Sequence, residues 1–134
     1  MTAQIKTGAV HHFTLTVTDV DRSRAFCADL FGFQQIAEFG PRAILSNGSV
    51  LLVLGPAPDP SQAIGDDSFD ENRVGLDHVS FSVGSRSDLE AALRVFTERG
   101  VSHGEIKDLA PFGIAVLAFR DPDNIQVELT APAG

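Results

Sequence analysis

The sequence lacks several features that define common protein classes. It has a single cysteine, Cys27, which excludes an intrachain disulfide. No apolar run approaches the roughly 20 residues that a membrane-spanning helix needs. Residues 1–10 contain no apolar core of a signal peptide. We therefore expect a cytoplasmic protein without a membrane partner.

Basic residues are also few. The 134 residues include 10 Lys and Arg against 18 Asp and Glu, which gives a formal net charge of −8 at pH 7. A protein that binds a phosphate backbone needs clustered Lys and Arg, so no nucleic-acid partner is expected. Much of the acidic charge lies in one stretch, and we interpret residues 59–73 as an acidic, solvated linker.

What the chain does contain is a globular composition and an internal repeat. Hydrophobic residues make up 43% of the sequence, which fits one compact domain over residues 1–134. The segment HFTLTVTDVDRSRAF from His12 resembles HVSFSVGSRSDLEAAL, which starts 66 residues later at His78. Repeat one therefore covers about residues 9–58, and repeat two covers about residues 74–132.

Each repeat is predicted to begin with a strand and to continue with a helix. Apolar and polar residues alternate along 13–17 and again along 79–83, which is typical of half-buried strands. The first helix is expected to start near Asp19 or Asp21 and to end at Gly32. By the same signals, the second helix should run from near Ser87 to Gly100.

Further strands follow each predicted helix. Two are joined by an Asn-Gly turn at Asn47 and Gly48, and two are joined at the DPDN turn of residues 121–124. The sequence thus predicts an α+β fold of two βαβββ repeats, whose curved mixed sheets surround a cleft. Each sheet is expected to hide its apolar face under the helices and to turn its polar face toward the cleft.

Three potential metal ligands lie on the predicted polar faces. His12 and His78 open the first strand of each repeat, and Glu128 lies on the last strand, where the repeat alignment places Val53 in the other half. If the repeats pack around a pseudo-twofold axis, two imidazoles and one carboxylate converge, as in the facial triads that bind divalent metals. Because neighbouring strand residues point to opposite faces, we expect His11 to face the packed side or the edge.

These segments resemble the vicinal oxygen chelate superfamily, which includes glyoxalase I, extradiol dioxygenases, methylmalonyl-CoA epimerase, fosfomycin-resistance enzymes and bleomycin-binding proteins. The resemblance rests on HHFTLTVTDVDRSRAF, LFGF, GLDHVSFSV and DPDNIQVEL and covers nearly the whole chain. It implies a divalent metal, Fe(II), Mn, Zn or Ni, held by His12, His78 and Glu128. A fourth ligand, present in glyoxalases and epimerases, would fall on Val53, which cannot coordinate a metal.

The resemblance leaves the reaction type open. Extradiol dioxygenases use nearby His and Tyr residues for proton transfer, whereas this chain has no Tyr and offers only His103 as an acid–base candidate. Fosfomycin-modifying enzymes share a His-x-Thr start, here His12 and Thr14. They also use cationic groups, one of them beyond the final carboxylate, where this chain has only LTAPAG.

Two functions remain as expectations. The first is a metal-dependent lyase, isomerase, dioxygenase or transferase, whose metal chelates vicinal oxygens of a small substrate and stabilises an oxyanion or enolate. The second is a protein of the bleomycin-resistance type that sequesters an antibiotic or toxin. The family implies a homodimer, with the cleft within one chain or across the dimer. Predicted pocket residues are Thr14, Ser80, Leu51, Val53 and Phe112.

Overall fold

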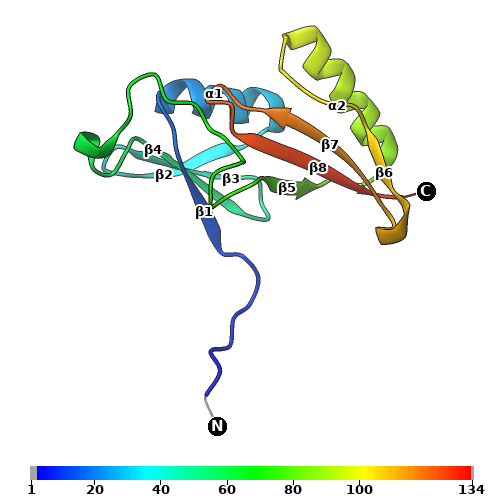
Figure 1. Cartoon of the computed structure of the whole chain (residues 1–134), viewed down its shortest axis with the longest axis horizontal. Helices are drawn as coiled ribbons and strands as arrows, with labels where there is room; N and C mark the ends of the chain where they lie inside the picture. The colour runs from blue at the N-terminus through cyan, green and yellow to red at the C-terminus, as the bar shows by residue number, and fades with distance from the viewer. Residues whose placement is uncertain (1–2, 134) are drawn as a thin grey trace. The chain divides into compact units, whose positions relative to one another are not determined.

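The computed structural model describes residues 3–133, and the chain divides into two compact units, Met1–Ala63 and Ile64–Gly134. Figure 1 follows the elements of both units from β1 to β8. Unit 1 contains β1 (His12–Thr16), α1 (Val20–Phe31), β2 (Gln34–Phe39), β3 (Arg42–Ser46), β4 (Leu51–Gly55) and the 3-10 helix η1 (Pro60–Gln62). Unit 2 contains β5 (Val79–Ser82), α2 (Arg86–Arg99), β6 (Lys107–Leu109), the 3-10 helix η2 (Ala110–Phe112), β7 (Ile114–Arg120) and β8 (Gln126–Pro132).

The two units share one topology. Their four-stranded sheets have the orders β1-β4-β3-β2 and β5-β8-β7-β6. In each sheet the first strand pairs in parallel with the last strand, and the other pairs are antiparallel. The predicted α+β fold of two βαβββ repeats is therefore confirmed.

Both helices end as the sequence predicts, and their starts are set by capping groups. The N-cap Asp19 accepts a hydrogen bond from the Arg22 backbone N–H at 3.0 Å, and α1 ends at Gly32 with φ 70°. The second helix begins at Arg86, slightly earlier than expected. Its N-cap is Ser85, whose backbone N–H donates to the Asp88 carboxylate at 3.0 Å.

Each helix covers the apolar face of its own sheet. In unit 2, Phe96 of α2 and Phe119 of β7 are almost fully buried, and their ring centroids lie 4.7 Å apart. Figure 1 shows α2 beside this sheet. In unit 1, α1 packs on β3 and β4, where Leu45 and Leu54 are almost fully buried. Neither helix in the described part of the chain has the length and apolar character to span a membrane.

The predicted turns form through side-chain hydrogen bonds. Asn47 accepts from the backbone N–H groups of Ser49 and Val50, and Gly48 takes a φ of 92°. At the second turn, the Asp121 carboxylate accepts from two backbone N–H groups, those of Asp123 and Ile125. Asn124 then adopts a left-handed φ of 65°.

The end of the acidic linker lies against unit 2. The backbone N–H of Phe69 donates to the Asp123 carbonyl at 3.0 Å, and the Asn124 side chain donates to the Phe69 carbonyl at 3.0 Å. The part of the linker up to residue 68 is exposed. Residues 72–73 are exposed as well, whereas residues 69–71 are half-buried where the chain contacts the β7–β8 turn.

Candidate metal centre

Strand pairing places Val53 and Glu128 at equivalent positions. In unit 1, Thr14 of β1 lies opposite Val53 of β4, and in unit 2, Ser80 of β5 lies opposite Glu128 of β8. The spacing of 66 residues that relates the two histidines also relates Thr14 to Ser80. The structure therefore supports the alignment that puts a valine where the other repeat has a carboxylate.

Glu128 lies on the face of its sheet that α2 does not cover, which we call the open face. Val127 is the register partner of Phe119, which packs on α2, so Val127 points to the helix. Its neighbour Glu128 must point the opposite way. The Glu128 side chain is 20% exposed, and its Oε1 lies 3.6 Å from Nε2 of His78, whose side chain is 38% exposed. Unit 2 thus brings two of the three predicted ligands together.

The other nitrogen of His78 is already engaged. Its Nδ1 lies 2.7 Å from Oδ1 of Asp77. The side-chain N–H group of Gln126 donates to the same carboxylate oxygen at 3.0 Å and to the Asp77 carbonyl at 3.1 Å. Because a carboxylate only accepts, a neutral His78 imidazole must donate from Nδ1 in this contact. Its Nε2 then carries the lone pair that could bind a metal.

Hydroxyl groups complete the open face of unit 2. Thr130, two residues after Glu128 on β8, lies with its Oγ1 3.4 Å from the Glu128 Oε1. The Ser80 hydroxyl contacts the Thr130 hydroxyl at 2.5 Å. Ser80, predicted as a pocket residue, is therefore on the same face as Glu128 and beside it.

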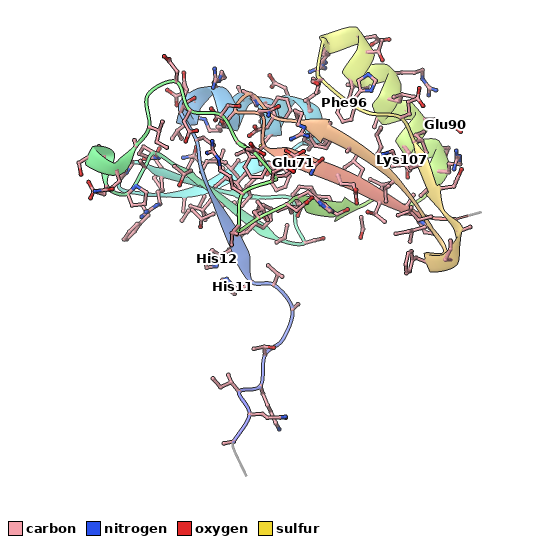
Figure 2. All side chains as sticks on the ribbon, in the orientation of Figure 1. His11, His12, Glu71, Glu90, Phe96 and Lys107 are labelled. Carbon is pink, nitrogen blue, oxygen red and sulfur yellow. The ribbon has the colours of Figure 1, made fainter. Side chains whose placement is uncertain are left out.

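An ion pair between Arg120 and Glu71 lies next to Gln126, the residue that contacts Asp77. Arg120 donates to both carboxylate oxygens of Glu71, at 3.0 and 2.7 Å, and to the Gln126 side-chain oxygen at 3.4 Å. The hydrogen bonds from Arg120 lower the pKa of Glu71 to about 2, and Glu71 in turn raises the pKa of Arg120. Glu71 is among the residues labelled in Figure 2. The guanidinium is thus neutralised within the protein.

Sequence reasoning missed this supporting network. Asp77 and Gln126 were visible only as polar neighbours of the predicted ligands. Glu71 and Arg120 are 49 residues apart, and Glu71 lies in a stretch that the composition predicts to be solvated. The only sequence feature that pointed to this network was the alternation that puts Gln126 on the same face of β8 as Glu128.

In unit 1, His12 lies exposed at the start of β1, with Leu51 of β4 opposite. Figure 2 labels His12 and His11 where the N-terminal segment meets this strand. Their Nδ1 atoms lie 2.9 Å apart. His11 is exposed and precedes the first residue of β1, so it lies outside the strand and not on its packed side.

The remaining candidates lie elsewhere. Phe112 is 77% exposed in η2. His103 forms a bridge to Phe119 and its ring centroid lies 6.1 Å from that of Phe96, so it packs on the helix side of the sheet. Because Glu128 points to the open face, the structure does not bring His103 to the candidate ligands. Leu51 and Val53 are half-buried, and Val53 has Thr14 and Ile44 as strand neighbours.

The donor atoms present fit a divalent metal. An imidazole nitrogen and a carboxylate oxygen suit ions such as Fe(II), Mn, Zn and Ni. A ligating His commonly donates its other N–H to a carboxylate, as His78 does to Asp77. Among the described residues, the structure gathers no group of three or more His, Cys, Asp or Glu side chains that could hold an ion. Unit 2 therefore brings together the donor atoms of two predicted ligands, His78 and Glu128.

Comparison with known proteins identifies the family. The sequence model of the Glyoxalase/Bleomycin resistance protein/Dioxygenase superfamily matches residues 9–129, so the chain belongs to this superfamily. It is 30% identical to the uncharacterized protein YwkD of Bacillus subtilis (strain 168) over 128 residues, which cover 90% of this chain and 94% of YwkD. The predicted family is thus confirmed.

Solved structures agree with this assignment. A glyoxylase/bleomycin resistance protein/dioxygenase domain from Frankia sp. EAN1pec is 28% identical, with a TM-score of 0.77 over 95% of this chain and 93% of that one. A mutant of the fosfomycin resistance protein FosX from Listeria monocytogenes, complexed with Mn(II) and 1S,2S-dihydroxypropylphosphonic acid, is 19% identical. Its TM-score is 0.72 over 96% of this chain and 92% of its own, and at this identity the likeness concerns the fold alone.

Proposed function

We propose that this chain is a divalent-metal-dependent enzyme of its superfamily, with His12, His78 and Glu128 as the protein ligands. The observation that carries the proposal is the pair formed by His78 Nε2 and Glu128 Oε1, 3.6 Å apart on the open face. Metal–nitrogen and metal–oxygen bonds of roughly 2.0–2.2 Å allow one ion to contact two donors at this separation. The proposed third ligand is His12, which opens the equivalent strand of repeat one.

The residues around these ligands favour a small substrate with adjacent oxygens and a partly apolar body. A bound divalent ion would polarise such oxygens as a Lewis acid. Val53 supplies no donor, so a three-ligand set keeps coordination positions for substrate and water. Leu51, Val53 and Ile44 provide an apolar surface in unit 1, whereas the Ser80 and Thr130 hydroxyls provide hydrogen bonds in unit 2.

Charge argues against a strongly anionic substrate as the preferred one. Arg120 is the cation of the unit 2 network, and Glu71 neutralises it through two hydrogen bonds. The structure of the FosX mutant, which shares the fold, contains a ligand of this kind. We therefore expect catechols and 2-oxoaldehydes to bind before phosphonates in a screen of this protein.

A second candidate is sequestration of an antibiotic or toxin. It is favoured by the apolar Val53 and Ile44, neighbours on β4 and β3 at the place where glyoxalases would have a ligand. A sequestering protein needs no metal. Metal content therefore separates the two functions before any substrate is known.

The test is elemental analysis after loading with Mn, Fe(II), Zn or Ni and desalting. Wild type is expected to keep one ion per chain, whereas His12→Ala, His78→Ala and Glu128→Ala should each lose it. Glu98→Ala, an exposed carboxylate on α2, serves as the control and should keep the ion. If wild type holds no more metal than a variant that combines His12→Ala, His78→Ala and Glu128→Ala, the enzyme proposal fails and sequestration becomes the better explanation.

For assembly and setting, we propose a homodimer in the cytoplasm. The sheets of both units have free edge strands, and small βαβββ units leave apolar edges to cover. The single cysteine fits a reducing compartment.

A further inference from the structure

The residue before each proposed histidine ligand contacts the same atom of that histidine. Nδ1 of His78 lies 2.7 Å from the Asp77 carboxylate, and Nδ1 of His12 lies 2.9 Å from Nδ1 of His11. His11 and Asp77 are 66 residues apart, which is the spacing of the repeat. The two contacts are therefore equivalent in position, although their chemistry differs.

In unit 2 the contact selects one tautomer of His78. A neutral imidazole has one N–H and one lone pair, and the carboxylate of Asp77 can only accept. The proton is therefore on Nδ1, and the lone pair is on Nε2, the atom that lies 3.6 Å from Glu128. Asp77 itself is fixed by the Gln126 amide, which is on the same strand as Glu128.

In unit 1 the contact between two Nδ1 atoms requires that one of them carries a proton. If His12 donates to the lone pair of His11, then Nε2 of His12 is free to bind a metal. If His11 donates instead, the proton of His12 is on Nε2 and blocks that atom. The rings meet edge to face, at 84° with centroids 5.1 Å apart, and His11 makes this contact from outside the strand.

We infer that His11 and Asp77 are positioning residues that hold His12 and His78 in the tautomer with a free Nε2. His11 would accept the hydrogen bond from Nδ1 with a neutral imidazole nitrogen, which is the weaker interaction. Asp77 accepts it with a charged carboxylate. The inference deepens the proposed function, because it rests on His12 and His78 as ligands. It also answers why two adjacent histidines open repeat one: the second binds and the first orients it.

The first test reads the tautomers directly, without metal. Nitrogen chemical shifts of ¹⁵N-histidine-labelled, metal-free protein at about pH 8, above the ordinary imidazole range, distinguish a protonated from an unprotonated ring nitrogen. We expect Nδ1–H and a bare Nε2 for both His12 and His78. In His11→Phe and Asp77→Ala, the affected histidine should shift toward a mixture of tautomers. A wild-type His12 with its proton on Nε2 would overturn the inference for unit 1.

The second test measures Mn²⁺ binding to the full chain by titration calorimetry. Loss of an orienting partner of a metal-bound histidine weakens metal affinity by roughly 10- to 100-fold, so we expect this range for Asp77→Ala. His11→Phe should lose less. His11→Asp gives repeat one the residue of repeat two and should bind at least as tightly as wild type. Asp77→Asn keeps an accepting oxygen and should fall between wild type and Asp77→Ala.

Matched controls separate orientation from folding and charge. Val10→Ala changes an exposed neighbour of His11, and Glu98→Ala removes a distant carboxylate of unit 2, so both should bind Mn²⁺ as wild type does. Should wild type bind no Mn²⁺ while the tautomers respond as expected, the metal proposal fails and the positioning role stands. Should wild type bind while neither variant alters a tautomer or the affinity, the positioning role fails alone.

Discussion

Single residues decide what the two repeats can do chemically, and Val53 shows this best. It occupies the strand position that Glu128 has in the other unit. A carboxylate at this half-buried site would lie between Thr14 and Ile44, where losing water is costly unless a cation compensates it. The valine thus avoids an unpaired charge and limits the protein ligands of the proposed ion to three.

Val53→Glu should therefore make stability depend on metal. We expect the free energy of unfolding of metal-free Val53→Glu to be about 1–3 kcal/mol lower than that of wild type. The variant should therefore unfold at a lower temperature. Added Mn²⁺ should restore much of this loss, because the new carboxylate gains a cation. Thermal unfolding with and without Mn²⁺ measures both effects, with Val53→Leu as the apolar control. Equal destabilisation with and without Mn²⁺ would place residue 53 away from the ion.

The Glu71–Arg120 pair should make stability sensitive to acid. Arg120 lowers the pKa of Glu71 from its ordinary 4.5 to about 2, so the unfolded chain takes up this proton at a higher pH than the folded chain. The contribution of the pair is therefore complete above pH 4.5 and is lost as the pH falls toward about 2.

Glu71→Gln provides the comparison. At about pH 7 it should unfold at a lower urea concentration than wild type. This difference between the two proteins should shrink steadily as the pH is lowered to about 3. Urea unfolding curves across this range measure the change. A difference that stays constant with pH would show that Glu71 contributes by packing rather than by its charge.

The residues of the site differ in how far sequence can predict them. His12, His78 and Glu128 could be proposed as ligands from the sequence because alternation along a strand and the repeat both assign them a face. Asp77 and Gln126 became visible only when β5 and β8 paired, because their contact joins residues 49 positions apart. The position of His103 could not be predicted for a related reason: a polar loop and a bridge beside Phe96 have the same sequence signal.

At the scale of elements, strands and helices with strong local signals were predicted and two weak strands were not located. The turn at Asn47 and Gly48 and the helix ends at Gly32 and Gly100 formed as expected. β2 has a register shift between Gln35 and Ala37, which breaks the alternation that identifies a strand. β6 has only three residues, all exposed, so it carries no apolar pattern.

The start of α2 depends on Asp88. This carboxylate accepts the Ser85 backbone N–H at 3.0 Å, and it lies in the first turn, where the helix dipole favours a negative charge. Asp88→Ala should lower the free energy of unfolding by about 1 kcal/mol. Urea unfolding measures it, with Glu98→Ala in the last turn as the control that should cost nothing. An equal loss in both variants would contradict a specific contribution from the capping hydrogen bond of Asp88.

At the scale of the whole chain, duplication explains both the fold and its asymmetry. The two units keep the same strand order and the same parallel strand pair. The pattern of strands and helices in one repeat therefore predicts the topology of the other. They differ in the open face, which is apolar around Val53 and polar around Glu128. A repeat can thus conserve packing on the helix side while the opposite face changes its chemistry.

Strand β2 is the surface at which we expect two chains to associate. All six of its residues are exposed, one of its edges has no strand neighbour within unit 1, and Ile36 and Phe39 are 59% and 69% exposed. An apolar edge strand of this kind tends to associate, so we expect it to contribute to the proposed dimer contact. Light scattering at micromolar concentration should therefore give twice the 14.3 kDa of one chain.

Charged substitutions on β2 locate the contact. Ile36→Lys combined with Phe39→Lys should give the mass of one chain, because two lysines at the edge oppose association. Ile5→Lys is the matched control, since Ile5 is 90% exposed in the N-terminal segment and should leave the dimer intact. A wild-type monomer would refute the dimer. A dimer that persists in the double variant would move the contact to another surface, because β2 is the strand that both substitutions disable.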